Sequence, residues 1–294
     1  MWTVASLCAL KLMYTREDCL ALVERSPAAV AAHDKQAWLD MFARNYSVED
    51  PVGSLPHVPD PRDGHALEPL SRFYDTFIAP NDIRFHVEQD FVCGLQVMRD
   101  LTMEIRMSPR VVVQTPMHLL YELCDEQGEL KIARLAAHWE MRAIAKQQMA
   151  YGLASLAASM RSTVRILRYL GLGGLRGFMQ GASGIGDTGK QQVQAFFRSC
   201  NDADIDALQG LCSAADMQVA LPSLDEQISL LQLLTAGGQF SLGKMLAAGN
   251  TVSASYSYTR DNRCSKGVAL FQLEPQSASI TRLNLYCRGK DFVL

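Results

Sequence analysis

The sequence predicts an α+β protein of two domains, and three observations support that prediction. Helical periodicity comes first, from Arg16 to Phe42 and again from Leu67 to Phe77, and strand-like segments follow up to Glu140. Helices followed by hairpins are typical of helices packed on one antiparallel sheet. The second half repeats this order, and 294 residues suit two domains of about 100–150 residues each.

The first half is expected to begin with two helices that are separated near Ser26-Pro27. A proline directly after a serine is typical of a helix start, where the serine caps the helix and the missing N–H costs nothing. Segments rich in apolar and β-branched residues then predict strands at Ile83–Gln89, Phe91–Met98, Leu101–Met107, Val111–Leu123 and Leu130–Glu140.

The second half reads as a diverged copy of the first. A helix containing Val193–Phe197 and a second helix over 202–211 precede Val219–Pro222, which occupies the place of Val48–Pro51. Strands are expected at Val252–Thr259, Gly267–Leu273 and Ile280–Tyr286. We therefore predict domains at 1–140 and 187–294, and such a repeat suggests two like domains paired within one chain or with a second copy.

Residues 141–186 are expected to form a basic amphipathic helical linker. The segment holds six Arg and Lys residues and no Asp or Glu, whereas the remainder holds 22 basic and 31 acidic residues. Apolar residues recur at spacings of three and four from Met149 to Leu170, and the glycines from Gly171 to Gly177 are expected to end the helix. Two interpretations stay open: a linker packed across both domains, or peripheral contact of residues 141–176 with an anionic membrane.

The composition argues against several classes of protein. The net charge of −3 argues against a nucleic-acid binder. The eight cysteines form no CxxC pair, which favours free thiols in a reducing, cytoplasmic setting over disulfides or a metal site. No run of 18 apolar residues predicts a spanning helix. Residues 1–13 are interpreted as a hydrophobic N-terminal arm rather than a signal peptide.

The stretch of residues 44–54 carries the candidate catalytic group. Asp50 is expected on a stiff loop just past an apolar helix, because Pro51 cannot continue a helix and Gly53 permits a tight turn. Apolar surroundings raise the pKa of a carboxyl group and make it a useful proton shuttle, whereas the same side chain could also cap a turn.

The run Val48-Glu49-Asp50-Pro51-Val52-Gly53-Ser54, with Pro56, Gly64 and Phe73-Tyr74, resembles the ketosteroid isomerase branch of the NTF2-like/SnoaL-like superfamily. The resemblance extends from about Ala31 to Ser54 and then weakly to about Glu140. It implies that the fold is a tandem of two NTF2-like cone domains with an interior pocket, joined by the long amphipathic helix. It also implies that Asp50 carries a proton between two carbons of an apolar ketone.

The resemblance also assigns the other site residues. Its oxyanion donors fall at Ser26 and, through Thr115-Pro116-Met117-His118, at His118, so His118 is predicted to assist Asp50. The expected ligand-binding residues are Ser26, Trp38, Phe42, Tyr74, Met117 and Trp139. In the second half Leu221 replaces the carboxylate, and because leucine cannot exchange a proton, catalysis is expected only in the first domain.

We therefore expect an isomerase-like or lyase-like enzyme that acts on a steroid, polyketide, terpenoid or similar apolar carbonyl compound, with no cofactor and no metal. The first alternative is a non-catalytic protein that binds an apolar ligand. Such a protein could do so in solution or at a membrane surface. The second alternative is an assembly module, because the fold also serves as a protein-binding scaffold.

Overall fold

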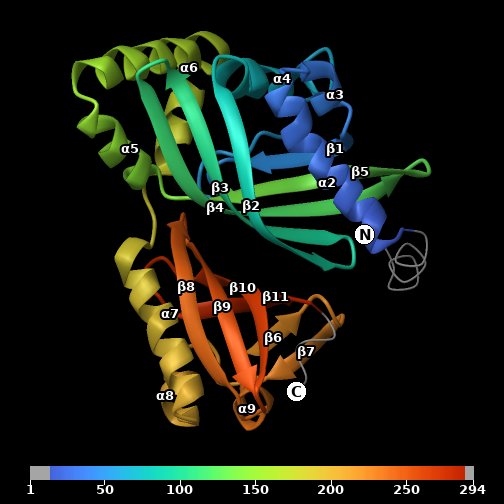
Figure 1. The fold of residues 1–294 in the computed structure, drawn as a ribbon, viewed down its shortest axis with the longest axis vertical. Coiled ribbons are helices and arrows are strands. Elements are labelled where there is room, and N and C mark those ends of the chain that lie inside the picture. Colours follow the sequence, from blue (N-terminus) through green and yellow to red (C-terminus); the bar gives the residue numbers. More distant parts are fainter. Residues whose placement is uncertain (1–13, 289–294) are drawn as a thin grey trace.

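Two α+β units, each built on its own sheet, make up the computed structural model (Figure 1). It describes residues 14–288, without the side chains of 153–158, so the arm predicted at residues 1–13 lies outside the described residues. In the figure the first unit runs from blue to green and the second from gold to red, and the helices that connect them are yellow-green.

The first unit follows the predicted order of helices and then strands. Its elements are α2 (Arg16–Ala31), α3 (Lys35–Leu39), β1 (Phe42–Glu49), α4 (Glu68–Phe73), the π-helix η1 (Tyr74–Ile78), β2 (Asp82–Cys93), β3 (Gln96–Ser108), β4 (Val111–Glu126) and β5 (Glu129–His138). The strand order is β1-β5-β4-β3-β2, in which β1 runs parallel to β5 and the remaining neighbours are antiparallel. Ile83–Gln89 and Leu101–Met107 are therefore parts of longer strands. The single strand predicted at Phe91–Met98 is wrong, because this segment contains the turn at residues 94–95 that joins β2 to β3.

The second unit repeats that strand order. Its elements are α7 (Gly186–Asn201), α8 (Ile205–Gly210), β6 (Gln218–Leu221), β7 (Glu226–Ser229), α9 (Leu230–Thr235), β8 (Gln239–Ala248), β9 (Thr251–Arg260), β10 (Arg263–Leu273) and β11 (Ile280–Cys287). The order β6-β11-β10-β9-β8 matches the first sheet, again with a parallel first pair, and β7 extends the edge. Leu221 ends β6 where Glu49 ends β1. That this unit is a diverged NTF2-like domain stays a prediction.

The predicted helix break at Ser26-Pro27 is wrong. Helix α2 continues through Pro27, and Ser26 is buried within it rather than capping a helix. A proline inside a helix leaves the carbonyl four residues earlier without its N–H partner. Here that carbonyl belongs to Val23, and Nη1 of the buried Arg99 on β3 donates to it at 3.2 Å. A side chain from the sheet thus satisfies the gap that the sequence pattern interpreted as a helix boundary.

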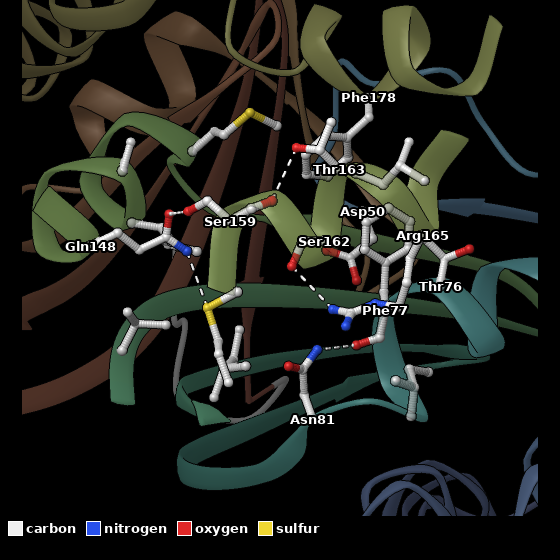
Figure 2. Close-up of a pocket in the computed structure, with 18 of the residues that line it drawn as sticks. Asp50, Thr76, Phe77, Asn81, Gln148, Ser159, Ser162, Thr163, Arg165 and Phe178 are labelled. Carbon is white, nitrogen blue, oxygen red and sulfur yellow. Dashed lines mark hydrogen bonds between the residues drawn. The ribbon is translucent and has the colours of Figure 1, made fainter. Parts of the chain in front are cut away.

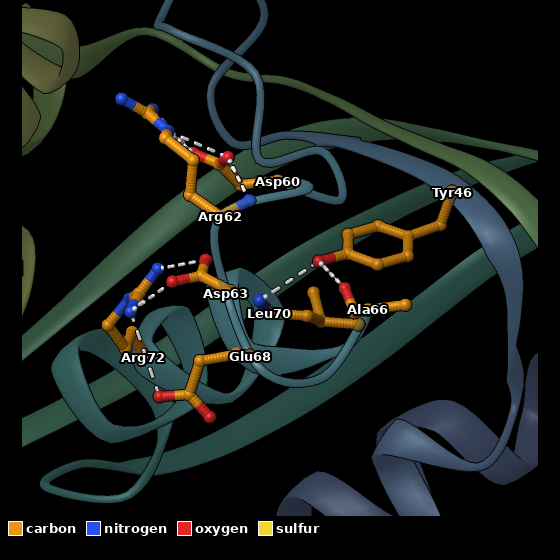
Figure 3. Close-up of polar contacts among 8 residues, drawn as sticks. All are labelled: Tyr46, Asp60, Arg62, Asp63, Ala66, Glu68, Leu70 and Arg72. Atoms are coloured by element: carbon orange, nitrogen blue, oxygen red, sulfur yellow. Dashed lines mark hydrogen bonds and ion pairs between the residues drawn. The ribbon is translucent and has the colours of Figure 1, made fainter.

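The segment before Asp50 is a strand rather than the end of a helix. Strand β1 begins at Phe42, directly after the short α3, and pairs with β5 through Val48 and Glu49. The loop from β1 to α4 is fixed by polar contacts, as Figure 3 shows. The Tyr46 hydroxyl accepts from the Leu70 N–H and donates to the Ala66 carbonyl, and Arg72 pairs with Asp63 at 2.6 Å. These contacts hold the loop against α4 and β1.

The 141–186 segment folds as two helices, α5 (Met141–Ala150) and α6 (Leu153–Gln180), which cover one end of the first sheet (Figure 1). Gly171, with φ 66°, interrupts α6, but the helix resumes and includes the later glycines that were expected to end it. Phe178 stacks on Phe77 of η1 with ring centroids 5.1 Å apart. Among the described helices, none is long and apolar enough to cross a membrane.

The two units pack sheet against sheet. Met98 and Leu120 of the first sheet join Val268 and Tyr286 of the second in one buried apolar cluster. Two backbones also touch at one edge, where a Cβ atom on Gly53 would lie 2.5 Å from the Cα of Gly249. Intramolecular pairing is therefore the arrangement of the described chain.

Buried polar groups complete the interface between the units. Lys244 of β8 forms an ion pair with Asp100 of β3, and both side chains are mostly buried. The Ser255 hydroxyl donates to Asp100 at 2.6 Å and therefore accepts from Nε2 of His118 at 2.8 Å. Nδ1 of His118 then accepts from the Ser253 hydroxyl at 2.7 Å. This network ties β3 and β4 to β8 and β9.

Replacing Asp100 with Asn should destabilise the protein, because Lys244 would keep a buried charge without its counterion. Loss of one partner of a buried ion pair costs about 3–5 kcal/mol, and we expect a loss of that size in urea denaturation. The matched control is Glu88→Gln, since Glu88 also pairs with Lys244 but its side chain is 58% exposed. The control should change the unfolding free energy by less than about 0.5 kcal/mol. Equal effects of both substitutions would contradict this account of the interface.

Candidate functional site

Asp50 and Trp139 are brought together by the parallel pairing of β1 with β5. Asp50 follows the last residue of β1, and Trp139 follows the last residue of β5. Parallel neighbours end at the same edge of a sheet, so the two side chains emerge side by side. The Val52 N–H donates to the Ala137 carbonyl at 2.8 Å and extends the pairing past Asp50. Trp139 then donates its indole N–H to Oδ1 of Asp50 at 2.5 Å.

The Asp50 carboxyl group titrates unusually high for an aspartate. Protein atoms surround it, and this desolvation raises its pKa to about 6, while the Trp139 hydrogen bond works in the opposite direction. Its side chain nevertheless keeps some accessible surface, because part of it faces a cavity. A carboxyl group that is largely ionised at neutral pH yet more basic than usual suits a general base.

The cavity beside Asp50 has a volume of about 280 Å³ and a mostly apolar wall (Figure 2). Strands β2, β3 and β4 supply one side through residues such as Ile83 and Met103, and η1 supplies Phe77. The roof consists of α5 and α6, with Ile144, Ile166 and Phe178 among the lining residues. The volume is near the lower end of the range for small-molecule sites, about 300–1,000 Å³. The helices that were predicted as a linker thus build half of the cavity.

A smaller inner cavity of about 50 Å³ adjoins the outer one, and Asp50 lines both. Three predicted residues, Ser26, Trp38 and Met117, face the inner cavity. Trp38 donates its indole N–H to the Ser26 hydroxyl at 3.2 Å, which fixes both groups. Together with Asp50, these three are the predicted site residues that line the inner cavity, and its other lining residues were not predicted.

Tyr121 is a polar residue of the inner cavity that the sequence analysis missed. It lies on β4, two strand positions beyond Leu119, and its phenol interacts with Ser26 and Arg99. Burial raises the pKa of Tyr121 above its usual value, so the phenol keeps its proton and can donate it in a hydrogen bond. Strand alternation was the available signal, because Tyr121 shares the pocket-facing parity of Met117.

Tyr74 and Phe42 line neither cavity. Both pack on the far side of Trp38, with ring centroids 5.6 Å and 4.8 Å from it, and both are buried. They position Trp38 within the apolar core instead of meeting a ligand directly.

The prediction that His118 faces the pocket is wrong. Its neighbour Met117 points into the cone, and because side chains alternate along a strand, His118 points to the opposite face, toward the second unit. Although serine, histidine and aspartate can form a nucleophilic triad, His118 and Ser253 are 0% exposed, so no substrate reaches them.

Asp50→Asn should stabilise the folded protein at neutral pH. The folded-state pKa of about 6 exceeds the ordinary value of 3.8, so the folded protein binds the proton more tightly than the unfolded chain. The stability that this carboxyl group provides is complete below about pH 4 and is lost as the pH rises through 6. We expect the variant to exceed the parent by about 3 kcal/mol at pH 7.5 in urea denaturation, and to approach it at pH 4.

The matched control for that comparison is Asp216→Asn, which makes the same change on an exposed residue. It should produce no pH-dependent difference from the parent. A parallel pH dependence in the parent and in Asp50→Asn would show that the Asp50 carboxyl group is not desolvated.

Comparison with known proteins concerns the first unit. Residues 23–135 match the model of the SnoaL-like domain. Among solved structures, the Δ5-3-ketosteroid isomerase from Mycobacterium sp. is similar at 29% identity, over 43% of this chain and 95% of that chain, with a TM-score of 0.36. A comparison with curated proteins gave no match.

Two further solved structures are similar to less than half of this chain. A Mycobacterium tuberculosis protein in complex with estradiol-17beta-hemisuccinate shows 23% identity, over 43% of this chain and 96% of that chain, with a TM-score of 0.37. An epoxide hydrolase of the LEH-like type from M. tuberculosis shows 12% identity, over 49% and 97% of the two chains, with a TM-score of 0.37. The family match, together with the helix and strand order of the first unit, identifies residues 23–135 as a SnoaL-like domain of the NTF2-like superfamily.

Proposed function

We propose that the first unit is a proton-transfer enzyme of the isomerase or lyase type that acts on an apolar carbonyl compound such as a steroid, polyketide or terpenoid. Asp50 is its general base. The observation that carries this proposal is the Asp50 carboxyl group, which lies where two apolar cavities meet and has a pKa of about 6. A ligand that fills both cavities would pass directly beside it.

The inner cavity suits the carbonyl end of such a ligand. Removal of a proton next to a carbonyl places negative charge on the carbonyl oxygen, and one preorganised donor there is typically worth about 2.7–4 kcal/mol. The Ser26 and Tyr121 hydroxyl groups are the donors available at this end. Tyr121 thus takes the supporting role that the sequence assigned to His118.

The proton would follow a short path. Ionised Asp50 removes a proton from a carbon next to the carbonyl and holds it while the enolate forms. It then returns the proton to another carbon of the same conjugated system, so that no proton is gained or lost overall. The Trp139 N–H holds the carboxylate toward the ligand throughout. For a lyase, the second step instead expels a leaving group.

A non-catalytic binding protein for an apolar ligand is the second candidate. One observation favours it: the described wall of the inner cavity offers Ser26 and Tyr121 as oxyanion donors but no second carboxyl group beside Asp50. The two candidates differ in what Asp50 does, because a binder uses only its shape and polarity.

Replacing Asp50 with Asn should separate the candidates when a Δ5-3-ketosteroid is the probe. An enzyme should lose about 10²–10⁴-fold in kcat, since that is the usual contribution of a positioned base, while its affinity changes little. In the parent, kcat should rise as the pH increases through about 6 and then level off, because only the ionised carboxylate accepts a proton. Stopped-flow absorbance of the conjugated ketone measures both quantities.

Asp216→Asn serves again as the control and should keep full activity. Turnover by Asp50→Asn within a few-fold of the parent would exclude Asp50 as the base. Binding without turnover in the parent, detected by quenching of tryptophan fluorescence, would favour the binding protein.

We also propose peripheral membrane contact through α6. It exposes Met160, Val164 and Leu172, and its Arg161 and Arg176 are exposed as well. Basic helices with an exposed apolar face bind anionic interfaces. The chain should therefore co-sediment with phosphatidylserine vesicles at low salt, and Val164→Glu should abolish this. Absence of sedimentation with such vesicles would refute the contact.

A further inference from the structure

An arginine without an acidic partner faces the outer cavity. Arg165 of α6 lines the cavity that also holds Asp50, and its Nη2 atom donates to the Ser162 hydroxyl at 3.0 Å (Figure 2). Its Nε atom is buried and has no hydrogen-bond partner among the described residues. No described carboxylate forms an ion pair with Arg165, and residues 141–186 contain no Asp or Glu.

Arg165 differs in this respect from the other arginines of the helix. Arg161 and Arg168 are exposed, so water solvates their charges, whereas Arg165 is partly buried against the cavity wall. Burial, together with the nearby Arg161, lowers the pKa of the Arg165 guanidinium, but an arginine keeps its proton at neutral pH. The cavity therefore contains a permanent positive charge that forms no ion pair with a described side chain, Asp50 included, although Asp50 lines the same cavity. Such a partly buried charge is costly unless a ligand provides the counterion.

A second unsatisfied atom lies on the same cavity wall. The amide nitrogen of Asn81 donates to the Phe77 carbonyl at 2.8 Å, which leaves its Oδ1 atom buried without a partner among the described residues. Asn81 and Arg165 both line the outer cavity and neither lines the inner one. Ser26 and Tyr121 line the inner cavity instead, and Asp50 lines both cavities.

We propose that Arg165 binds a carboxylate on the far end of the ligand, so that the substrate class is an apolar keto acid. The ligand would place its carbonyl in the inner cavity, its reacting carbons beside Asp50 and its carboxylate on Arg165. The Nε and Nη atoms of an arginine match the two oxygens of a carboxylate in a bidentate pair, which explains why the unpartnered atom is Nε. The Asn81 carbonyl is then the acceptor for a donor on the ligand, such as a neighbouring hydroxyl.

This inference rests on the proposed function only in that a ligand occupies the cavity. It adds the chemical class of that ligand and assigns Arg165 as the residue that determines it. Arg165 does not touch the reacting carbons in this arrangement, so its effect should appear in affinity rather than in the proton-transfer step.

The test compares two probes and three proteins. The probes are a 3-ketosteroid with a carboxylic acid at the opposite end of its ring system, and the methyl ester of the same compound. The proteins are the intact chain, Arg165→Met, which keeps an apolar side chain of similar length, and Arg168→Met, which removes an exposed arginine instead. Dissociation constants come from the quenching of tryptophan fluorescence.

We expect the intact chain to bind the acid at least 10-fold more tightly than the ester. Arg165→Met should weaken binding of the acid by about 10–100-fold, the usual range for a charge-assisted hydrogen bond, and should change binding of the ester by less than about threefold. Arg168→Met should change neither. Circular dichroism of Arg165→Met establishes that the variant is folded.

Equal affinity of the intact chain for acid and ester would overturn the inference, and so would equal losses for both probes in Arg165→Met. Either result leaves the proposed function standing when the ester still binds and Asp50→Asn still abolishes turnover. Failure of both probes to bind the intact chain would overturn the inference and remove steroids from the proposed function as well.

Discussion

The first sheet of this protein is buried on both faces. That constraint determines which side chains of its strands face the cavity and which face the second unit. Side chains of β4 alternate between a cavity and an interface, so Met117 and Tyr121 face one side while His118 and Leu120 face the other. A shift of one residue would exchange the two sets and bury polar groups against the wrong partners. The register of β4 therefore determines both the lining of the cavity and the contacts between the two units.

The segment between the units also has more than one structural role. Helices α5 and α6 connect the two sheets, close the cavity opposite Asp50 and supply Arg165 to its wall. Because Phe178 stacks on Phe77 and the Leu55 N–H donates to the Gly177 carbonyl, α6 belongs to the first unit by packing although it follows that unit in sequence. A ligand in the cavity would contact both the SnoaL-like domain and this roof, which lies outside the matched residues 23–135.

Much of this could be predicted from the sequence where the determinants are local. Strands β2–β5 and β9–β11 follow from short patterns, whereas β1, β6, β7 and β8 were not predicted. The candidate residues Asp50 and Trp139 follow from the family resemblance. The break at Pro27 was wrong because Arg99, more than seventy residues away, satisfies the carbonyl that the proline leaves open. His118 was assigned to the wrong face of β4, because an error of one residue in the alignment moves a side chain to the opposite face of a strand. The roof could not be foreseen, since an apolar helical face has the same pattern whether it covers a cavity, joins two domains or meets a membrane.

The central claim is that Asp50 is a desolvated carboxyl group poised to exchange protons in an apolar cavity. Its most direct test is a pH titration of the aspartate carboxyl ¹³C resonances in the intact chain, with Asp50 assigned by its absence from Asp50→Asn. The account predicts a midpoint near pH 6 for this resonance. A midpoint near 4, the ordinary value for a hydrated aspartate, would contradict it.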